Sequence, residues 1–329
     1  MRIAQWKKHV IVGIGLLAMG ALRLPFERQL TVELDEERLL PPKLEIMTGE
    51  KIGQTFSAVS LGGLRTLVAT FLNLRAFSYF SEQQWANVDE TFNMIVDLAP
   101  RTRYYWDTGS WHQAYNAASY YLYESDLPPL RRKLAWRESI EKGRDFLERG
   151  IRNNPKDPFL RERLGVLLSD SNKIAAFGDP AKSYQEAYDS YMDAVETGNA
   201  RGYAKRAALY SLARVPGREK EALELALEIK DEQGRAMPTM LGLLYTLGFH
   251  QDPDQPVLEL IDSIFPSREV AYEILGTQWL RTRDRFPVHG IAKALARLEK
   301  LLNVPEEKSI LKQTPQAPMD PDDYFSRER

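Results

Sequence analysis

Histidine and acidic residues are the first candidates for chemistry, because imidazole is both the commonest metal ligand and the usual general base. The chain has four histidines, and none forms the His-x-x-x-His or His-Glu-x-x-His spacing of a helical metal site. His250 precedes Asp252 and Asp254, and these three side chains could bind a cation. Prolines alternate with the two aspartates, which favours a solvated turn instead. We therefore predict no metal site.

The other patterns that signal catalysis are missing or stand in the wrong context. The sequence contains no cysteine, no Walker motif and no Gly-x-Ser-x-Gly turn. Gly13 and Gly15 lie within an apolar run and follow no predicted strand, so they do not form a dinucleotide-binding loop. A hydrolase of cell-wall glycan would need a catalytic Glu in a separate globular domain, and the tail from Asn303 to Arg329 is too short for one. We predict a protein without catalytic residues or cofactor.

Aromatic side chains gather between Tyr104 and Tyr123, where eight of them could stack on sugars or hold a peptide. Such residues more often form a core, and this is the interpretation favoured for Trp106, Trp111 and Tyr115. A hydrogen-bonded packing role is likewise favoured for His112, next to Trp111. At least one of the tyrosines among Tyr120, Tyr121 and Tyr123 must face outward, because they stand too close together to share one face.

Charge and composition exclude one class of partner. Lys and Arg total 44 against 46 Asp and Glu, giving a net charge of −2, so no basic surface for nucleic acid is expected. None of the nine asparagines begins an Asn-x-Ser/Thr acceptor, which favours a bacterial chain over one that passes through a glycosylating compartment.

The N-terminus predicts a membrane anchor. Every residue from Val10 to Leu22 is apolar or Gly, and the run reaches the lower limit of a membrane span if it extends to residue 26. The basic start places residues 1–9 in the cytoplasm and the rest beyond the bacterial inner membrane, in the periplasm. A cleaved signal peptide is the alternative, since Ala18 and Gly20 form a small-x-small pair. Cleavage there would leave Leu-Arg-Leu-Pro near the N-terminus of the mature protein, which is unfavourable. This favours the uncleaved anchor.

The remaining chain divides by composition into three parts. Residues 27–56 are charged and broken by Pro41 and Pro42, and read as a juxtamembrane linker. Residues 57–303 carry helical periodicity. Residues 304–329 contain four prolines and few apolar side chains, which predicts a disordered tail or one that becomes ordered on a partner.

Helical segments in residues 57–303 repeat one arrangement of apolar residues. In each segment, three apolar or small residues stand at spacings of four and three, so they share one helix face. In several segments a proline then ends the helix. Examples start at Val88, Gly143, Ala187 and Ala222, at intervals of 55, 44 and 35 residues. Two further helical segments share another pattern. It reads Leu241-Gly242-x-x-Tyr245 and, 34 residues later, Leu275-Gly276-x-x-Trp279.

This pattern resembles the tetratricopeptide repeat family, whose helix pairs use small residues for close approach and one large side chain to fill the gap to the next pair. The resemblance covers about residues 68–303, with no complete copy. It implies an all-α, right-handed superhelical solenoid of degenerate helix-turn-helix repeats. The segment ending in Trp111-His-Gln-Ala-Tyr-Asn116 also resembles membrane-anchored bacterial proteins of this class.

We expect from these features a scaffold or assembly subunit that binds other proteins in a bacterial envelope complex, because stacked repeats supply an extended concave surface. An envelope hydrolase or glycan-handling enzyme on a helical platform is the alternative. Arginine and aromatic residues dominate interface energetics, and the first helix of each pair is expected to line the groove. The predicted partner-binding residues are Arg103, Trp111, Tyr115, Asn116, Arg161 and Arg163.

Overall fold

The computed structural model describes residues 64–233 and 237–316, together with Ala18, Met19, Leu22, Gln29 and Phe325. Every regular element in this part of the chain is a helix, so the predicted all-α class is confirmed there. The proposed anchor and linker lie outside the continuously described ranges. None of the described helices is long and apolar enough to span a membrane.

The chain forms two compact units, a division that the sequence did not predict. One unit takes in the chain up to Asp126 and the segment Leu134–Leu160, and the other takes in Leu127–Lys133 and the chain from Arg161. Because α7 (Pro129–Asn153) runs through this boundary, most of that helix belongs to the first unit.

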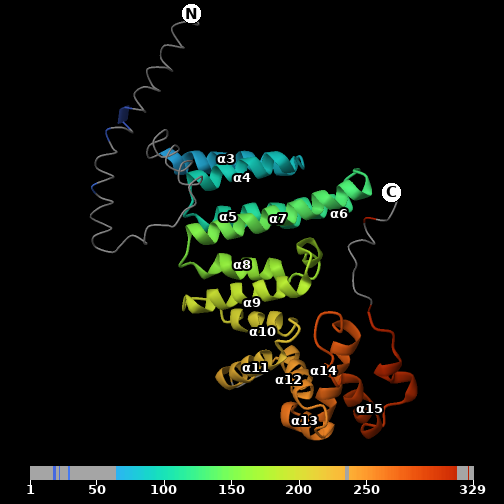
Figure 1. Cartoon of the computed structure of the whole chain (residues 1–329). Helices are drawn as coiled ribbons and strands as arrows, with labels where there is room; N and C mark the ends of the chain where they lie inside the picture. Colours follow the sequence, from blue (N-terminus) through green and yellow to red (C-terminus); the bar gives the residue numbers. More distant parts are fainter. Residues whose placement is uncertain are drawn as a thin grey trace, which may run out of the picture. The chain divides into compact units, whose positions relative to one another are not determined.

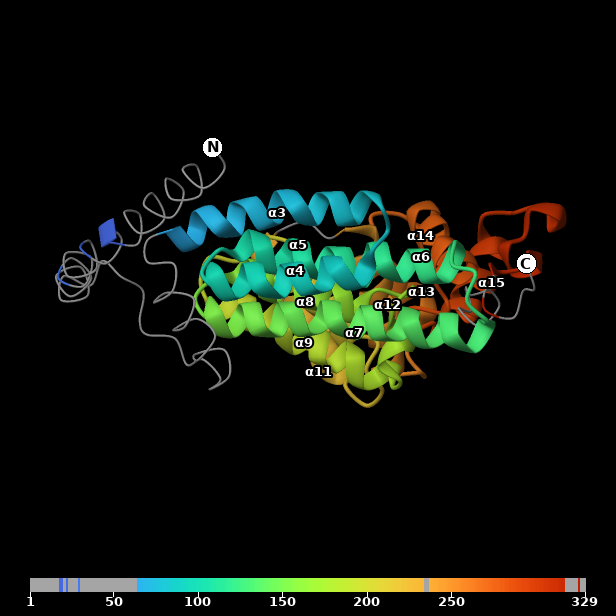
Figure 2. The same cartoon turned by 90° about the horizontal axis from the view of Figure 1, so that it is seen from above.

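In the first unit, the helices besides α7 are α3 (Arg65–Ser81), α4 (Trp85–Leu98), α5 (Arg103–Trp111), the π-helical segment η2 (His112–Ala117) and α6 (Ala118–Tyr123). Of these, α5, η2 and α6 follow one another without a break as one long helical segment. This segment, α3, α4 and α7 lie side by side, each roughly antiparallel to the next along the chain (Figures 1 and 2). The repeat pattern of α4 packs inward, since Val88, Phe92 and Ile95 are all buried. Pro100 follows the end of α4, as the pattern predicts.

Close contact between η2 and α7 depends on a glycine. A methyl group at Gly143 would lie 2.5 Å from Ala114 Cβ and 2.9 Å from the Ser110 carbonyl oxygen. Backbone atoms of neighbouring helices therefore approach to a distance that only glycine permits. The residue at the start of the repeat pattern in α7 thus sets how near the two helices lie.

In its described residues, the second unit contains eight further α-helices, most of which pair with their neighbours in sequence (Figure 1). They are α8 (Pro158–Ser169), α9 (Pro180–Glu196), α10 (Ala204–Leu212), α11 (Glu219–Gln233), α12 (Pro238–Gln251), α13 (Val257–Ile264), α14 (Arg268–Arg281) and α15 (Ile291–Leu301). A continuous apolar core runs through α10–α15. The repeat patterns that start at Ala187, Ala222, Leu241 and Leu275 lie on α9, α11, α12 and α14. The eight residues of α13 are too few to show such a pattern.

The structure corrects the expected disorder of the tail for residues 304–316. They form two short 3-10 turns, η4 (Glu306–Lys308) and η5 (Ile310–Lys312), and Ile310 packs against the core. A methyl group at Gly276 of α14 would lie 2.3 Å from Ile310 Cδ1. Ile310 seated over a glycine thus contributes to ordering a segment whose composition predicts disorder.

Candidate functional site

The predicted partner-binding residues divide between the two units. Arg103, Trp111, Tyr115 and Asn116 lie on α5 and η2 of the first unit. Arg161 and Arg163 lie on α8 in the second unit, where each is half-buried. The six residues therefore form two groups, one in each unit.

Trp111 and Tyr115 form a stacked aromatic pair. Their ring centroids are 4.3 Å apart and the ring planes are inclined by 17°. The Trp111 side chain is 43% exposed and Tyr115 is half-buried, so the prediction that both belong to the core is wrong. Trp106 instead occupies the core, with its indole N–H donating to the Pro100 carbonyl oxygen at 2.7 Å.

Trp111 and Trp106 point to different sides of the helix because they are five residues apart. At 3.6 residues per turn this spacing separates two side chains by about 140° around the helix axis, so a buried Trp106 leaves Trp111 toward the outside. Trp111 is the last residue of α5 and precedes the π-helical segment, in which Gln113, Ala114 and Ala117 face inward. The prediction that Trp111 lies in the core followed residue type and overlooked this spacing.

His112 has the packing role that the sequence favours. Its ring lies 4.8 Å from the ring of Phe80 on α3 and 5.4 Å from that of Phe92 on α4, measured between centroids. Asn116 Nδ2 is 3.1 Å from His112 Nδ1. Burial lowers the pKa of His112 below its ordinary value of 6.5. Asn116, predicted as a partner-binding residue, thus also positions a buried imidazole.

Arg103 lies at the start of α5 and contacts the segment that follows α7. Its Nη1 donates to Asp157 Oδ2 at 3.3 Å, and its guanidinium lies 5.1 Å from the centre of the Phe159 ring. More than half of the Arg103 side chain is exposed, so the ion pair contributes little stability and the guanidinium is accessible to a partner.

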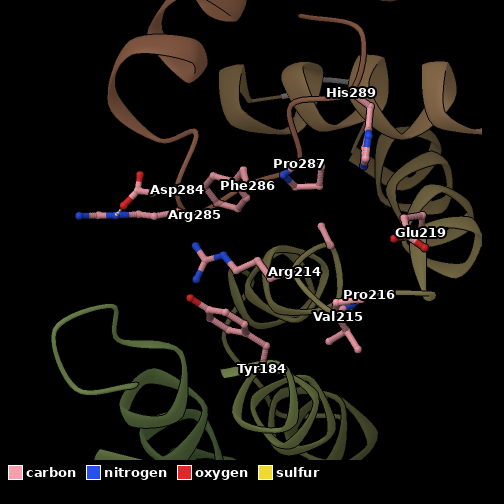
Figure 3. A pocket seen from close by; sticks show the side chains of 11 residues that line it. Tyr184, Arg214, Val215, Pro216, Glu219, Asp284, Arg285, Phe286, Pro287 and His289 are labelled. Atoms are coloured by element: carbon pink, nitrogen blue, oxygen red, sulfur yellow. Dashed lines mark ion pairs between the residues drawn. The ribbon is translucent and has the colours of Figure 1, made fainter. Parts of the chain in front are cut away.

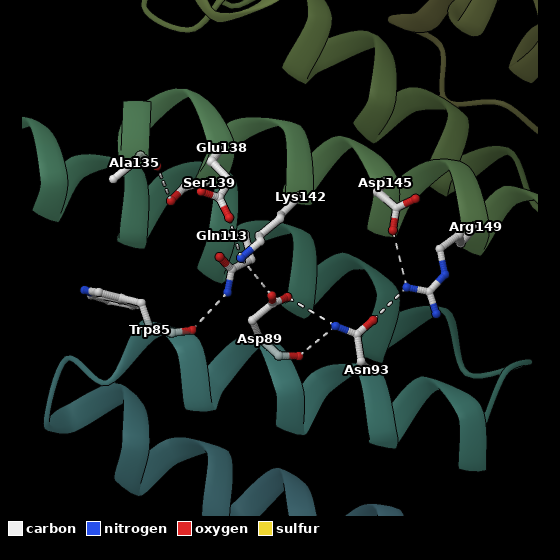
Figure 4. A network of polar contacts seen from close by, with 10 residues as sticks. All are labelled: Trp85, Asp89, Asn93, Gln113, Ala135, Glu138, Ser139, Lys142, Asp145 and Arg149. Carbon is white, nitrogen blue, oxygen red and sulfur yellow. Dashed lines mark hydrogen bonds and ion pairs between the residues drawn. The ribbon is translucent and has the colours of Figure 1, made fainter. Parts of the chain in front are cut away.

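Polar side chains join α4 to α7 and η2 below this surface (Figure 4). Lys142 Nζ lies 3.1 Å from both Asp89 Oδ2 and Glu138 Oε1. Arg149 Nη1 donates to Asn93 Oδ1 at 2.7 Å. The contacts of Lys142 with Asp89 and of Arg149 with Asn93 join α4 to α7.

A row of exposed apolar residues on α3 was missed by the sequence analysis. The exposed fraction is 52% for Leu67, 61% for Phe71, 62% for Leu74 and 68% for Phe77. Their spacing of four, three and three places them on one helix face, with Leu64 one turn before. We call these five residues the α3 stripe.

The candidate cation ligands do not converge. His250 lies against His289, with ring centroids 4.4 Å apart, and Asp252 Oδ1 accepts from the backbone N–H of Asp254. Among the residues that the structure describes, no three His, Asp or Glu side chains are grouped to hold a metal ion. The pair of aspartates forms the turn that the prolines suggest.

In comparisons with known proteins, no family model, curated protein or solved structure matches this chain.

Proposed function

We propose that this chain is a non-enzymatic, membrane-anchored scaffold of tetratricopeptide-like helix pairs, which binds another protein of a bacterial envelope complex through the α3 stripe and the Trp111–Tyr115 pair. The anchor is residues 10–26, and the body of the protein lies in the periplasm. The pairing of neighbouring helices, with small residues at their contacts, supports a right-handed solenoid arrangement.

The observation that carries the proposal is the α3 stripe. Terminal helices of repeat arrays normally present a polar outer face to water, yet α3 presents Leu and Phe side chains with exposed fractions above 50% at four positions. Contiguous exposed apolar residues are typical of interaction sites.

An apolar helix of the partner protein is the occupant that fits best. The stripe runs along α3 from Leu64 to Phe77, about 20 Å at a rise of 1.5 Å per residue. The opposite face of α3 already packs on α4 through Ala69 and Ala76, so another helix would continue the same helix-on-helix packing. The helix has two arginines and no acid, which favours a partner helix with acidic flanks.

Site-specific photocrosslinking from α3 tests the occupant in intact cells. A photoreactive phenylalanine analogue replaces Phe71 in the full chain, with Leu227, an exposed residue of α11, as the control position. Mass spectrometry should identify an apolar helix of another envelope protein crosslinked at position 71 and not at position 227. Crosslinks confined to residues 1–63, to a second copy of the chain or to lipid would each overturn the assignment.

A pair of substitutions tests the arginines of α8. Arg161→Glu with Arg163→Glu should weaken retention of the partner identified from position 71, if its melting temperature is unchanged. Retention of that partner at the parental level would remove Arg161 and Arg163 from the binding surface, leaving the first unit as the site.

The anchor is tested by topology. A reporter that is active only in the periplasm, fused after Arg329, should be active, and protease added to spheroplasts should digest the body of the protein. A silent reporter together with protection from protease would refute the proposed localisation.

A further inference from the structure

The loops after α10 and α14 enclose a pocket within the second unit, with a volume of about 260 Å³. Arg214 and Val215 come from the first loop, and Arg285 and Phe286 come from the second (Figure 3). Tyr184 of α9 completes this side of the pocket. A basic group, a hydroxyl and apolar surfaces therefore meet in one cavity.

Arg214 is held between two aromatic rings. Its guanidinium carbon lies 4.8 Å from the centre of the Tyr184 ring and 4.4 Å from that of Phe286. Burial lowers the pKa of Arg214, but a guanidinium still remains protonated in proteins. The ring faces stabilise its charge, and the Tyr184 side chain also forms a hydrogen bond with the guanidinium.

The donors of Arg214 are poorly satisfied. Nη1 donates to the Ser169 carbonyl oxygen at a long 3.4 Å, and the buried Nε has no hydrogen-bond partner. In the described part of the chain, no carboxylate lies within ion-pair distance of this guanidinium. A buried cation without an anionic partner is costly, so an anion that enters the pocket would relieve that cost.

The acids of the pocket are engaged elsewhere. Asp284 Oδ2 lies 3.7 Å from Arg285 Nε. Glu219 accepts from the backbone N–H of Gly217 at 3.1 Å, and although partial burial opposes ionisation, backbone hydrogen bonds keep its pKa below the ordinary value. In Figure 3, Glu219 and His289 lie toward the end of the pocket away from the Arg214 guanidinium.

We propose that this pocket binds a small organic acid, with its carboxylate on the N–H edge of Arg214 and its apolar body against Val215, Phe286 and Pro287. A planar carboxylate matches the paired donors of a guanidinium. The volume lies below the usual range for pockets that take drug-sized ligands, which selects a ligand of about one ring. This inference does not depend on the proposed scaffold role.

Calorimetric titration of the detergent-solubilised full chain tests the site with benzoate as the probe. Benzamide has the same shape without the charge, and inorganic phosphate is an oxyanion without an apolar body. We expect benzoate to bind at least about tenfold more tightly than either, because only benzoate offers both features. Equal binding of benzamide, stronger binding of phosphate, or no heat with benzoate would overturn the proposal.

Variants locate the binding to Arg214. Arg214→Gln should weaken benzoate by about tenfold or more, the loss expected for a charge-assisted hydrogen bond. The matched control is Arg268→Gln, which removes an exposed guanidinium already paired with Asp262 at 2.7 Å and should leave affinity unchanged. Parental affinity in a folded Arg214→Gln protein would overturn the assignment.

A second variant serves if Arg214→Gln does not fold. Val215→Trp leaves the guanidinium in place and fills the pocket, so benzoate binding should be lost while the melting temperature stays near the parental value. Undiminished benzoate binding by Val215→Trp would place the ligand elsewhere and sink the idea.

Discussion

The ring of Tyr191 in α9 lies directly over Gly165 in α8, where an added methyl group would come within 2.7 Å of Tyr191 Cε2. Tyr191 is buried, and Ala187 and Ala194 beside it on α9 are fully buried. One large side chain therefore fills the space that three small residues leave between two helices.

This contact predicts that removing volume and adding volume both lower stability. Tyr191→Ala should lower the free energy of unfolding by about 3–5 kcal/mol, as other large-to-small core changes do. Gly165→Ala should cost about 1–3 kcal/mol through overpacking, and so should Ala187→Leu. Urea denaturation gives these values. Gly202→Ala is the control, since nothing lies within 4 Å of the added methyl group, and a loss there equal to that at Gly165 would contradict the explanation.

Glu162 of α8 should stabilise the second unit through its hydrogen bonds. Its carboxylate is 1% exposed and accepts from the Arg201 backbone N–H at 2.8 Å and the Tyr203 hydroxyl at 3.1 Å. We expect Glu162→Ala to cost about 1–3 kcal/mol. Glu162 also pairs with Arg201, whose side chain is 54% exposed. Loss of this ion pair should cost less than loss of a fully buried one, because the Arg201 guanidinium can be hydrated instead. Exposed Glu224 is the control, and Glu224→Ala should change stability by less than about 0.5 kcal/mol. Equal losses at the two positions would disprove the prediction.

Glu299 of α15 should hold the C-terminal segment in place. Its carboxylate accepts from the backbone N–H of Ile310 at 2.8 Å and from the Ser309 hydroxyl at 2.8 Å. In Glu299→Ala, amide hydrogen exchange at Ile310 should accelerate by about tenfold or more, and trypsin should cut sooner after Lys308. The control is Glu273→Ala, on the exposed side of α14, which should change neither the exchange rate at Ile310 nor the cleavage after Lys308. Unchanged exchange in Glu299→Ala would show that Ile310 packing alone orders the segment.

Stability should fall as the pH drops below about 6.5, and His112 should account for part of the loss. Burial lowers the pKa of His112 in the folded state, so below the ordinary pKa of 6.5 the unfolded chain binds the proton more readily. The pKa of His289 is lowered as well, mainly by burial and to a smaller extent by the nearby His250. The loss of stability caused by His112 is absent at pH 8. It grows as the pH falls from 6.5 toward the pKa of His112 in the folded state.

Urea midpoints at pH 8, 7, 6 and 5 measure this dependence. His112→Gln should flatten the decline between pH 7 and pH 5, and the further change His289→Gln should flatten it more. A decline of parental steepness in the double variant would assign the dependence to other groups.

Local sequence patterns predicted most helices because their causes are local. Pro100 and Pro155 end helices by removing a donor and clashing with the preceding turn, while Asp179 caps α9 by accepting from the Ala181 N–H at 2.9 Å. The buried faces of α4, α9 and α15 also follow from spacing, as Val88, Ala187 and Ala294 show by their complete burial. In the same way, Tyr123, 46% exposed, confirms that one of the tyrosines faces outward.

Other features depend on which helices meet, and sequence spacing does not contain that information. The α3 stripe is exposed because α4 covers only one face of an apolar helix. Arg214 and Phe286 are 72 residues apart in the sequence, and their contact exists only because two loops converge. The sequence by itself determined the helices and their inward faces through local backbone chemistry and periodicity. Tertiary packing decided the exposed surfaces and the pocket, since burial and charge pairing depend on neighbours distant along the chain.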